Sequence, residues 1–121
     1  MAKVIQEISV EVAKPNYFPN PIAKQCDCNS RFLKVTLVDE KVPITIEKCA
    51  EVYINANRID GKSGSYGGEV NDDGTVTVPL HSEMLELAGD VICDITIKNG
   101  KEKLTSTRFV VDVERVAAQE V

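Results

Sequence analysis

The sequence predicts an all-β sandwich of about seven or eight strands with one short helix, and three observations lead to this prediction. Polar and apolar residues alternate in several short stretches, which is the period-2 pattern of half-buried strands. These stretches recur about every ten residues, with turn residues between them, and no stretch has the length of a long helix. Asn99-Gly100 joins two of them and is the preferred dipeptide of a two-residue hairpin.

The predicted strands follow one another along the chain. They are 4–12, 31–38, 42–45, 51–59, 69–70, 75–80, 91–97 and 106–113. In the first strand the alternation directs Ile8, Val10 and Val12 inward, so Glu11 is predicted to face solvent. Pro43 predicts that the third strand lies at a sheet edge, because proline has no backbone N–H to donate to a neighbouring strand.

The two strands that flank Asn99-Gly100 form the predicted centre of the sandwich. Apolar side chains recur at every second position on one face of each, at Val91, Cys93, Ile95, Ile97, Phe109, Val111 and Val113. One short helix is predicted before them, at 83–88, with Ser82 as its N-cap and Gly89 as its end.

Two connections offer candidate interaction residues. The segment 13–24 contains three prolines and is predicted to be extended, with Tyr17 and Phe18 either folded back on the sandwich or exposed to a partner. The segment 60–68 is rich in glycine and serine and is predicted to be a loop or wide hairpin end, with Lys62 and Tyr66 as its candidate contacts.

The composition limits the domain organisation and the class of partner. A chain of 121 residues predicts a single sandwich domain at 3–115 with a tail at 116–121. The net charge of −5 and the scattered Lys and Arg argue against nucleic acid as a partner. No apolar run is long enough for a membrane helix. The N-terminus has no export signal pattern, and four cysteines are few for a disulfide framework, so the cysteines are predicted to be free thiols in a reducing compartment.

No residue pattern in the sequence predicts catalysis, a metal or a cofactor. Gly61-Lys62-Ser63 lacks the earlier glycine and the following helix of a phosphate loop. Cys26 and Cys28 are separated by one residue, closer than the usual zinc spacing, and Cys93 is in phase with the core. His81, the single histidine, is predicted to face solvent or to stabilise a turn.

Three parts of the chain resemble the N-terminal domain family of phage baseplate upper proteins. They are KQCDCNSRFL at 24–33; VPIT at 42–45 with Asp60-Gly61; and Pro79-Leu80, Met84-Leu85 and Gly89 with STRFVV at 106–111. The resemblance covers roughly residues 3–115 and departs from the family at Cys26, where the family tends to have glycine. It also covers one domain, whereas family members continue into a coiled coil and a further domain.

The resemblance implies an immunoglobulin-like antiparallel β-sandwich and a non-enzymatic structural protein of a phage or prophage. Such a module attaches receptor-binding proteins or fibres to the tail through protein–protein contacts, so the implied partners are other tail or baseplate proteins. A homotrimer is the implied oligomer, and the implied location is the virion after synthesis in the host bacterial cytoplasm. The alternative function is a host-surface or carbohydrate-binding module that uses the loop containing Tyr66.

Overall fold

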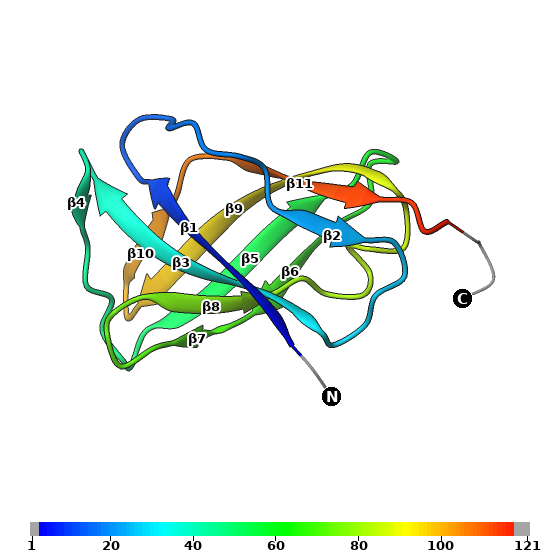
Figure 1. The fold of residues 1–121 in the computed structure, drawn as a ribbon. Coiled ribbons are helices and arrows are strands. Elements are labelled where there is room, and N and C mark those ends of the chain that lie inside the picture. The colour runs from blue at the N-terminus through cyan, green and yellow to red at the C-terminus, as the bar shows by residue number, and fades with distance from the viewer. Residues whose placement is uncertain (1–2, 118–121) are drawn as a thin grey trace.

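Eleven strands form two stacked sheets in the computed structural model, which describes residues 3–117 (Figure 1). Sheet A contains β1 (Val4–Glu11), β3 (Arg31–Asp39), β8 (Val76–Pro79) and β7 (Glu69–Val70) in that order, with β4 (Val42–Pro43) beside β3. Sheet B contains β2 (Ile22–Lys24), β11 (Phe109–Glu114), β9 (Gly89–Asn99), β5 (Glu51–Asn57) and β6 (Ser63–Gly67) in that order, with β10 (Glu102–Thr105) beside β9. The described residues contain no helix long and apolar enough to cross a membrane. The all-β prediction is confirmed.

The core lies between the two sheets, where alternate residues of each strand point inward. In β9 the predicted inward residues Val91, Cys93 and Ile95 are at most 1% exposed. Leu33, Val35 and Leu37 of β3 face them from sheet A and are equally buried. Fully burying a side chain of this size contributes roughly 1.5–3 kcal/mol, so these two central strands carry much of the stability.

The sheets are mixed rather than antiparallel, which corrects the prediction. β1 pairs with β3 in parallel along its whole length, and β2 pairs in parallel with β11. The remaining pairs are antiparallel. Alternation in the sequence shows which face of a strand is buried but not the direction of its neighbour, so the period-2 pattern fits both arrangements.

The predicted strand at 106–113 begins later, at Phe109 in β11, and β10 at 102–105, which the sequence does not predict, precedes it across a bulge. A two-residue hairpin turn forms one residue later than predicted: Asn99 is the last residue of β9 and pairs with Glu102, so the loop residues are Gly100 (φ 63) and Lys101, and β10 pairs with β9 from Asn99 back to Thr96. At Ser106 the register shifts by one residue, and its hydroxyl accepts the Ile95 N–H in place of a backbone carbonyl. Thr107 then turns across the end of the sandwich, where its N–H and hydroxyl both donate to the carbonyl of Glu11.

The helix predicted at 83–88 does not form. Two overlapping turns replace it, closed by the bonds from Met84 N–H to His81 O and from Leu85 N–H to Ser82 O. The carbonyls that a helix would use accept bonds from outside the segment instead: Arg58 donates to Glu83 and the Cys26 N–H to Leu85. One helical turn is too short to nucleate against these competing bonds.

Glu11 is buried, not exposed as the alternation predicts. Its carboxylate accepts the N–H groups of Glu40 (3.0 Å) and Lys41 (2.8 Å), the two central residues of the β3–β4 turn. Both turn residues have positive φ, 50° and 72°, as a type I′ hairpin requires. The outer end of sheet A is therefore covered by its own hairpin turn.

Side-chain amides occupy the free edges of β1 and β2, the neighbouring outer strands of the two sheets. Gln6 of β1 donates to the carbonyl of Ile22 in β2 and accepts the Ile22 N–H (2.7 and 3.1 Å). Asn16 accepts the N–H of Glu11 and donates to the carbonyl of Ser9, both in β1 (3.1 and 2.9 Å). Each amide replaces the two hydrogen bonds that a neighbouring strand would make.

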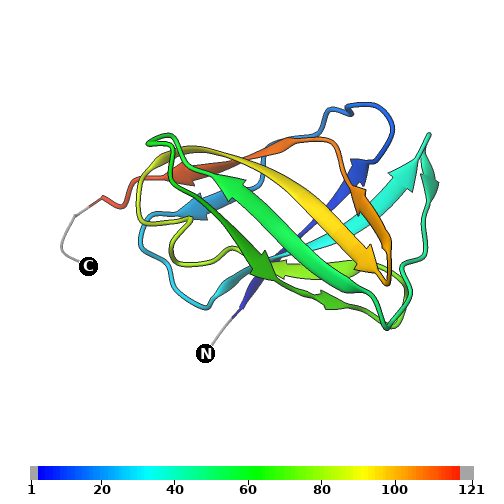
Figure 2. The same ribbon diagram turned by 180° about the vertical axis from the view of Figure 1, so that it is seen from behind.

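The chain passes from sheet B to sheet A at Gly67-Gly68, between β6 and β7. A Cβ at Gly68 would lie 2.3 Å from the carbonyl oxygen of Thr77, so any larger residue would push the strands apart. Gly68 also donates its N–H to the carbonyl of Val52 in β5. A glycine is thus required where the chain leaves β6 in sheet B and enters β7 in sheet A (Figure 2).

The division into a domain at 3–115 and a tail at 116–121 stays a prediction. The described strands lie between Val4 and Glu114, and residues 118–121 of the predicted tail lie outside the described part.

Candidate functional site

The predicted pair Tyr17 and Phe18 divides between the surface and the core. Phe18 is partly buried and packs against Phe109 of β11, with ring centroids 6.3 Å apart and planes tilted by 45°. The neighbouring Tyr17 is 99% exposed. Phe18 therefore folds back on the sandwich and Tyr17 is exposed, whereas a contact of Tyr17 with a partner stays a prediction.

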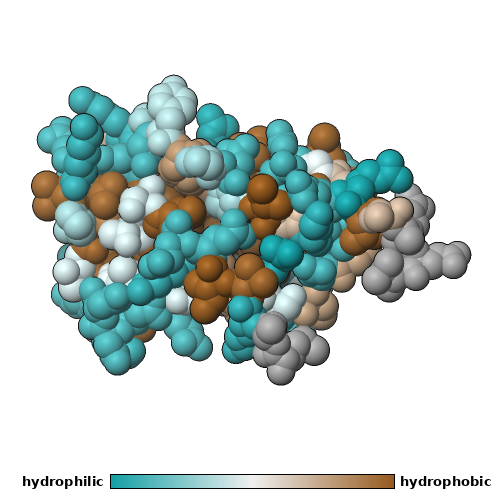
Figure 3. Space-filling model, in the orientation of Figure 1, coloured by the Kyte–Doolittle hydropathy of each residue, from teal (hydrophilic) through white to brown (hydrophobic). Residues whose placement is uncertain are grey.

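Tyr17 lies at the rim of a groove on the outer face of sheet A. The groove has a volume of about 800 Å³ and is floored by Val38 and Pro43, with Lys14 and Lys41 beside it. The face of the molecule on which sheet A lies is mostly hydrophilic and carries separate apolar patches (Figure 3). An exposed tyrosine beside a partly apolar groove has the chemistry of a protein-contact site, because tyrosine combines a large apolar area with one hydroxyl.

The other predicted residues, Lys62 and Tyr66, lie at the β5–β6 hairpin of sheet B. Tyr66 stacks on His81 with ring centroids 4.3 Å apart and planes 11° apart, and burial raises the pKa of its hydroxyl. Its hydroxyl lies so close to Gly64 that a Cβ there would be 2.4 Å away. The structure thus places Tyr66 as a packed residue and does not bring it together with Tyr17, which lies on the other sheet.

Arg58 connects this hairpin to the segment 81–88. Its guanidinium binds the carboxylates of Asp60 and Glu86 and donates to the carbonyl of Glu83 (2.9 Å). The hydrogen bonds to Arg58 lower the pKa of both Asp60 and Glu86. Lys62 extends the cluster, with its Nζ 3.7 Å from the carboxylates of Glu83 and Glu86.

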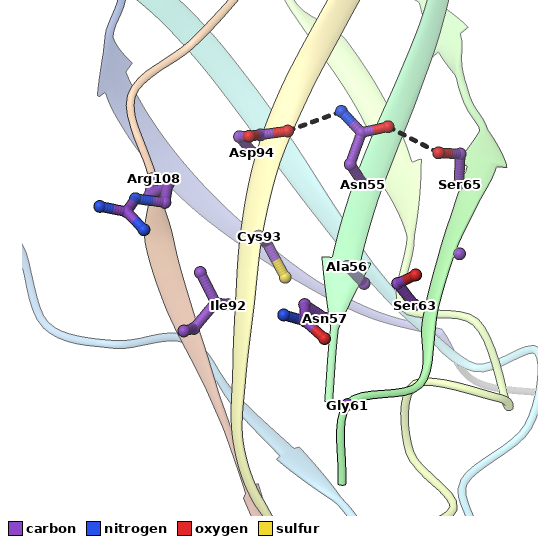
Figure 4. Close-up of a pocket in the computed structure, with 11 residues that line it drawn as sticks. Asn55, Ala56, Asn57, Gly61, Ser63, Ser65, Ile92, Cys93, Asp94 and Arg108 are labelled. Carbon is purple, nitrogen blue, oxygen red and sulfur yellow. Dashed lines mark hydrogen bonds between the residues drawn. The ribbon is translucent and has the colours of Figure 1, made fainter. Parts of the chain in front are cut away.

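A polar network on the outer face of sheet B was missed by the sequence reasoning. Asn55 donates to Asp94 (2.6 Å) and Thr96 (2.8 Å) and accepts the hydroxyl of Ser65 (2.7 Å), as Figure 4 shows for Asp94 and Ser65. Asn55, Asp94 and Ser65 line part of a shallow hollow of about 530 Å³ that extends to Arg108. The sequence signal for it is the polar half of these alternating strands, which bears Asn55, Asp94 and Thr96.

His81 and Cys93, two side chains with possible chemistry, have structural roles. His81 accepts the Glu83 N–H through Nδ1 (3.1 Å), which agrees with its predicted turn-stabilising role. Burial raises the pKa of the Cys93 thiol to about 12, so this cysteine is held as a neutral core residue. Within residues 3–117 no three metal-binding side chains gather in one cluster.

Comparison with known proteins identifies the relatives of this fold. The family model described as the BppU N-terminal domain matches residues 4–119. Among solved structures, the N-terminal domain of phage TP901-1 ORF48 is similar, with a TM-score of 0.73 and 15% sequence identity over 92% of this chain and 98% of that chain. No curated protein matches the chain.

Proposed function

Because the chain belongs to the family of BppU (baseplate upper protein) N-terminal domains, we propose that it is a non-enzymatic structural module of a phage or prophage tail that attaches receptor-binding or fibre components. The observation that carries this proposal is the family match over residues 4–119, and the fold likeness to a phage domain supports it. The module acts in the virion, after synthesis in the host bacterial cytoplasm, through contacts with other tail or baseplate proteins.

The proposed contact surfaces contain the four residues predicted from the sequence, in the segments 13–24 and 60–68. Tyr17 offers an exposed aromatic ring at the groove of sheet A, and Lys62 offers a half-exposed cation at the β5–β6 hairpin. Phe18 and Tyr66 complete the set but also pack against the core, so their replacement would change stability as well as contact.

The test compares phage particles that carry variants of this protein. Particles without the protein are expected to lack the receptor-binding components in electron micrographs and to lose adsorption. Tyr17→Ala and Lys62→Ala are expected to reduce adsorption while the purified domains melt normally. Lys101→Ala, at the exposed tip of the β9–β10 hairpin, is the matched control and should have no effect. Complete particles with normal adsorption in the absence of the protein would overturn the proposal.

A homotrimer is the oligomer proposed from the family, and light scattering after size exclusion in reductant tests it. A mass of three times 13.3 kDa supports a self-association surface on this domain. A monomer at every concentration argues that the trimer needs another segment or a tail partner. The immunoglobulin-like classification also stays a proposal, since two strand pairs are parallel.

The second candidate function is a host-surface or carbohydrate-binding module. The Asn55 network favours it, because the face holds fixed amide, hydroxyl and carboxylate groups around a hollow, which are the groups that bind sugar hydroxyls. Binding to a glycan or cell-wall panel that is lost in Asn55→Ala would support it. The absence of any signal on the panel would remove it.

A further inference from the structure

We propose that Asn99 is a site of spontaneous deamidation, and that the carboxylate formed there breaks the side-chain contact between the β9–β10 hairpin and the turn that precedes β5. The inference goes beyond the baseplate role and does not depend on it. An asparagine followed by glycine is the most exposed to attack by the next backbone nitrogen, because glycine has no side chain to obstruct the approach. The chain contains this dipeptide once, at Asn99-Gly100.

The structure leaves the attacking nitrogen of Gly100 accessible. Gly100 is exposed, and a Cβ built on it would meet no atom within 4 Å, so the loop has open space around it. Within residues 3–117 the Gly100 N–H donates no hydrogen bond, because the ladder of the hairpin ends at the pair of Asn99 and Glu102. No bond to the Gly100 nitrogen therefore has to break before it can react.

The reaction needs no partner other than water. The Gly100 nitrogen attacks Cγ of Asn99, so that a new C–N bond forms and the nitrogen loses its proton, while the Cγ–Nδ2 bond breaks and ammonia leaves. The product is a cyclic succinimide. Water then opens the ring at one of its two carbonyl carbons and leaves aspartate or isoaspartate, which adds about 1 Da and one negative charge to the chain.

Glu47 restrains the side chain of Asn99 before the reaction. Asn99 Nδ2 donates to Glu47 Oε2 (2.8 Å), and this bond joins residues 52 positions apart, the end of β9 and the turn closed by Ala50 N–H and Glu47 O. The side chain of an extended residue stands roughly perpendicular to its strand, so Cγ of Asn99 must move to reach the following nitrogen. The reaction therefore follows local opening of the hairpin end, which the bond to Glu47 opposes.

The aspartate product cannot make the same contact. A carboxylate has no N–H to donate, so two negatively charged groups would face one another where Asn99 and Glu47 are now hydrogen-bonded. Glu102, the ladder partner of Asn99, adds a further carboxylate at this end of the hairpin. Deamidation thus replaces an attraction between the hairpin and the turn by a repulsion.

Timed incubation at mildly alkaline pH tests the site and its restraint. Peptide mapping by mass spectrometry follows the gain of about 1 Da at Asn99, with the urea-denatured chain as the unrestrained reference. We expect Glu47→Ala to deamidate at Asn99 at least about threefold faster than the native chain, because it removes the bond to the amide. Glu69→Ala, which removes an exposed carboxylate from β7 in sheet A, is the matched control and should react at the native rate. A native Asn99 that stays intact after the denatured chain has reacted, or equal rates in Glu47→Ala and the native chain, would overturn the proposal.

A charge exchange tests the effect of the product. Asn99→Asp reproduces the aspartate and is expected to lower the melting temperature by about 3 °C. Asn20→Asp adds the same charge at an exposed position of the segment 13–24 and should melt within about 1 °C of the native chain. Glu47→Gln added to Asn99→Asp places an amide donor opposite the new carboxylate and should restore the native melting temperature. Equal melting of Asn99→Asp and the native chain would overturn the effect assigned to the carboxylate.

Discussion

The β3–β4 turn contains two non-glycine residues in the left-handed region, and Glu11 is the side chain that compensates for them. Glu11→Ala leaves the N–H groups of Glu40 and Lys41 without their charged acceptor, so we expect the free energy of unfolding to fall by about 2 kcal/mol. Denaturant unfolding measures the change. Glu7→Ala, on an exposed position of the same strand, is the control and should change stability by less than about 0.5 kcal/mol.

The same turn allows a rescue experiment. Replacing Glu40-Lys41 with Asn-Gly supplies residues that adopt positive φ readily, so this pair should recover part of the loss in Glu11→Ala. If the rescue is absent and the two changes are additive, Glu11 acts independently of the turn.

Cys26 has φ 68 at the third position of the turn closed by Asp27 N–H and Lys24 O, a position that favours glycine. This conformation gives a physical reason for the glycine that the family resemblance implies at this position. Cys26→Gly is expected to raise the free energy of unfolding by about 0.5–1 kcal/mol, because it removes the left-handed strain of a Cβ. Cys26→Ala keeps the Cβ and should show no gain in the same unfolding measurement. Equal stability of the two variants would contradict this reading.

Single residues also show what the alternation pattern cannot predict. It placed Val10 correctly in the core but directed its neighbour Glu11 to solvent, because the hairpin that folds over Glu11 comes from residues 39–42. It could not separate Tyr17 from Phe18, since an irregular proline-rich segment has no period. The burial of Phe18 depends on its contact with Phe109, which is distant in sequence.

Among the connecting elements, the β7–β8 hairpin is stabilised by an ionised carboxylate. Hydrogen bonds from Thr75 hydroxyl (2.6 Å) and N–H (3.1 Å), with Lys34 at 3.2 Å, lower the pKa of Asp73 to about 2. The contribution is fully present above the unfolded-state pKa of about 3.9 and is lost as the pH falls through about 2. We therefore expect the stability difference between the native chain and Asp73→Asn to shrink as the pH is lowered from 5 to 2. A difference that does not change with pH would contradict this assignment.

The hairpins and long strands were the elements best predicted from sequence. The glycine that the hairpin turn needs at Gly100 and the alternation in β9 and β11 act locally, so the residues themselves predict a turn and two strands there, although the loop lies one residue later than predicted. The segment 83–88 failed as a helix because its carbonyls bind Arg58 and the Cys26 N–H, partners that no local window contains. The polar network of Asn55 likewise depends on three neighbouring strands, β5, β6 and β9.

At the scale of the whole molecule, the four thiols should report on folding. Cys26, Cys28 and Cys49 are exposed, whereas Cys93 is 1% exposed and burial raises its pKa to about 12. Because thiolates are the reactive species, the folded chain is expected to take up three iodoacetamide groups and the fourth only on unfolding. Mass spectrometry after timed labelling counts them. Early modification of all four cysteines would mean that the two sheets open readily.

The parallel pairing of β2 with β11 has a consequence for how the chain reaches its native state. Among residues 3–117, β11 is the only strand that pairs with β2, and the ion pair that joins these strands, Lys24–Glu114, connects residues 90 positions apart. Closing so long a loop is entropically costly, and folds dominated by such distant pairs form slowly. On the ribosome, β2 must therefore wait for its strand partner until β11 has emerged, so this sheet edge forms only after the whole stretch between the two strands has been synthesised.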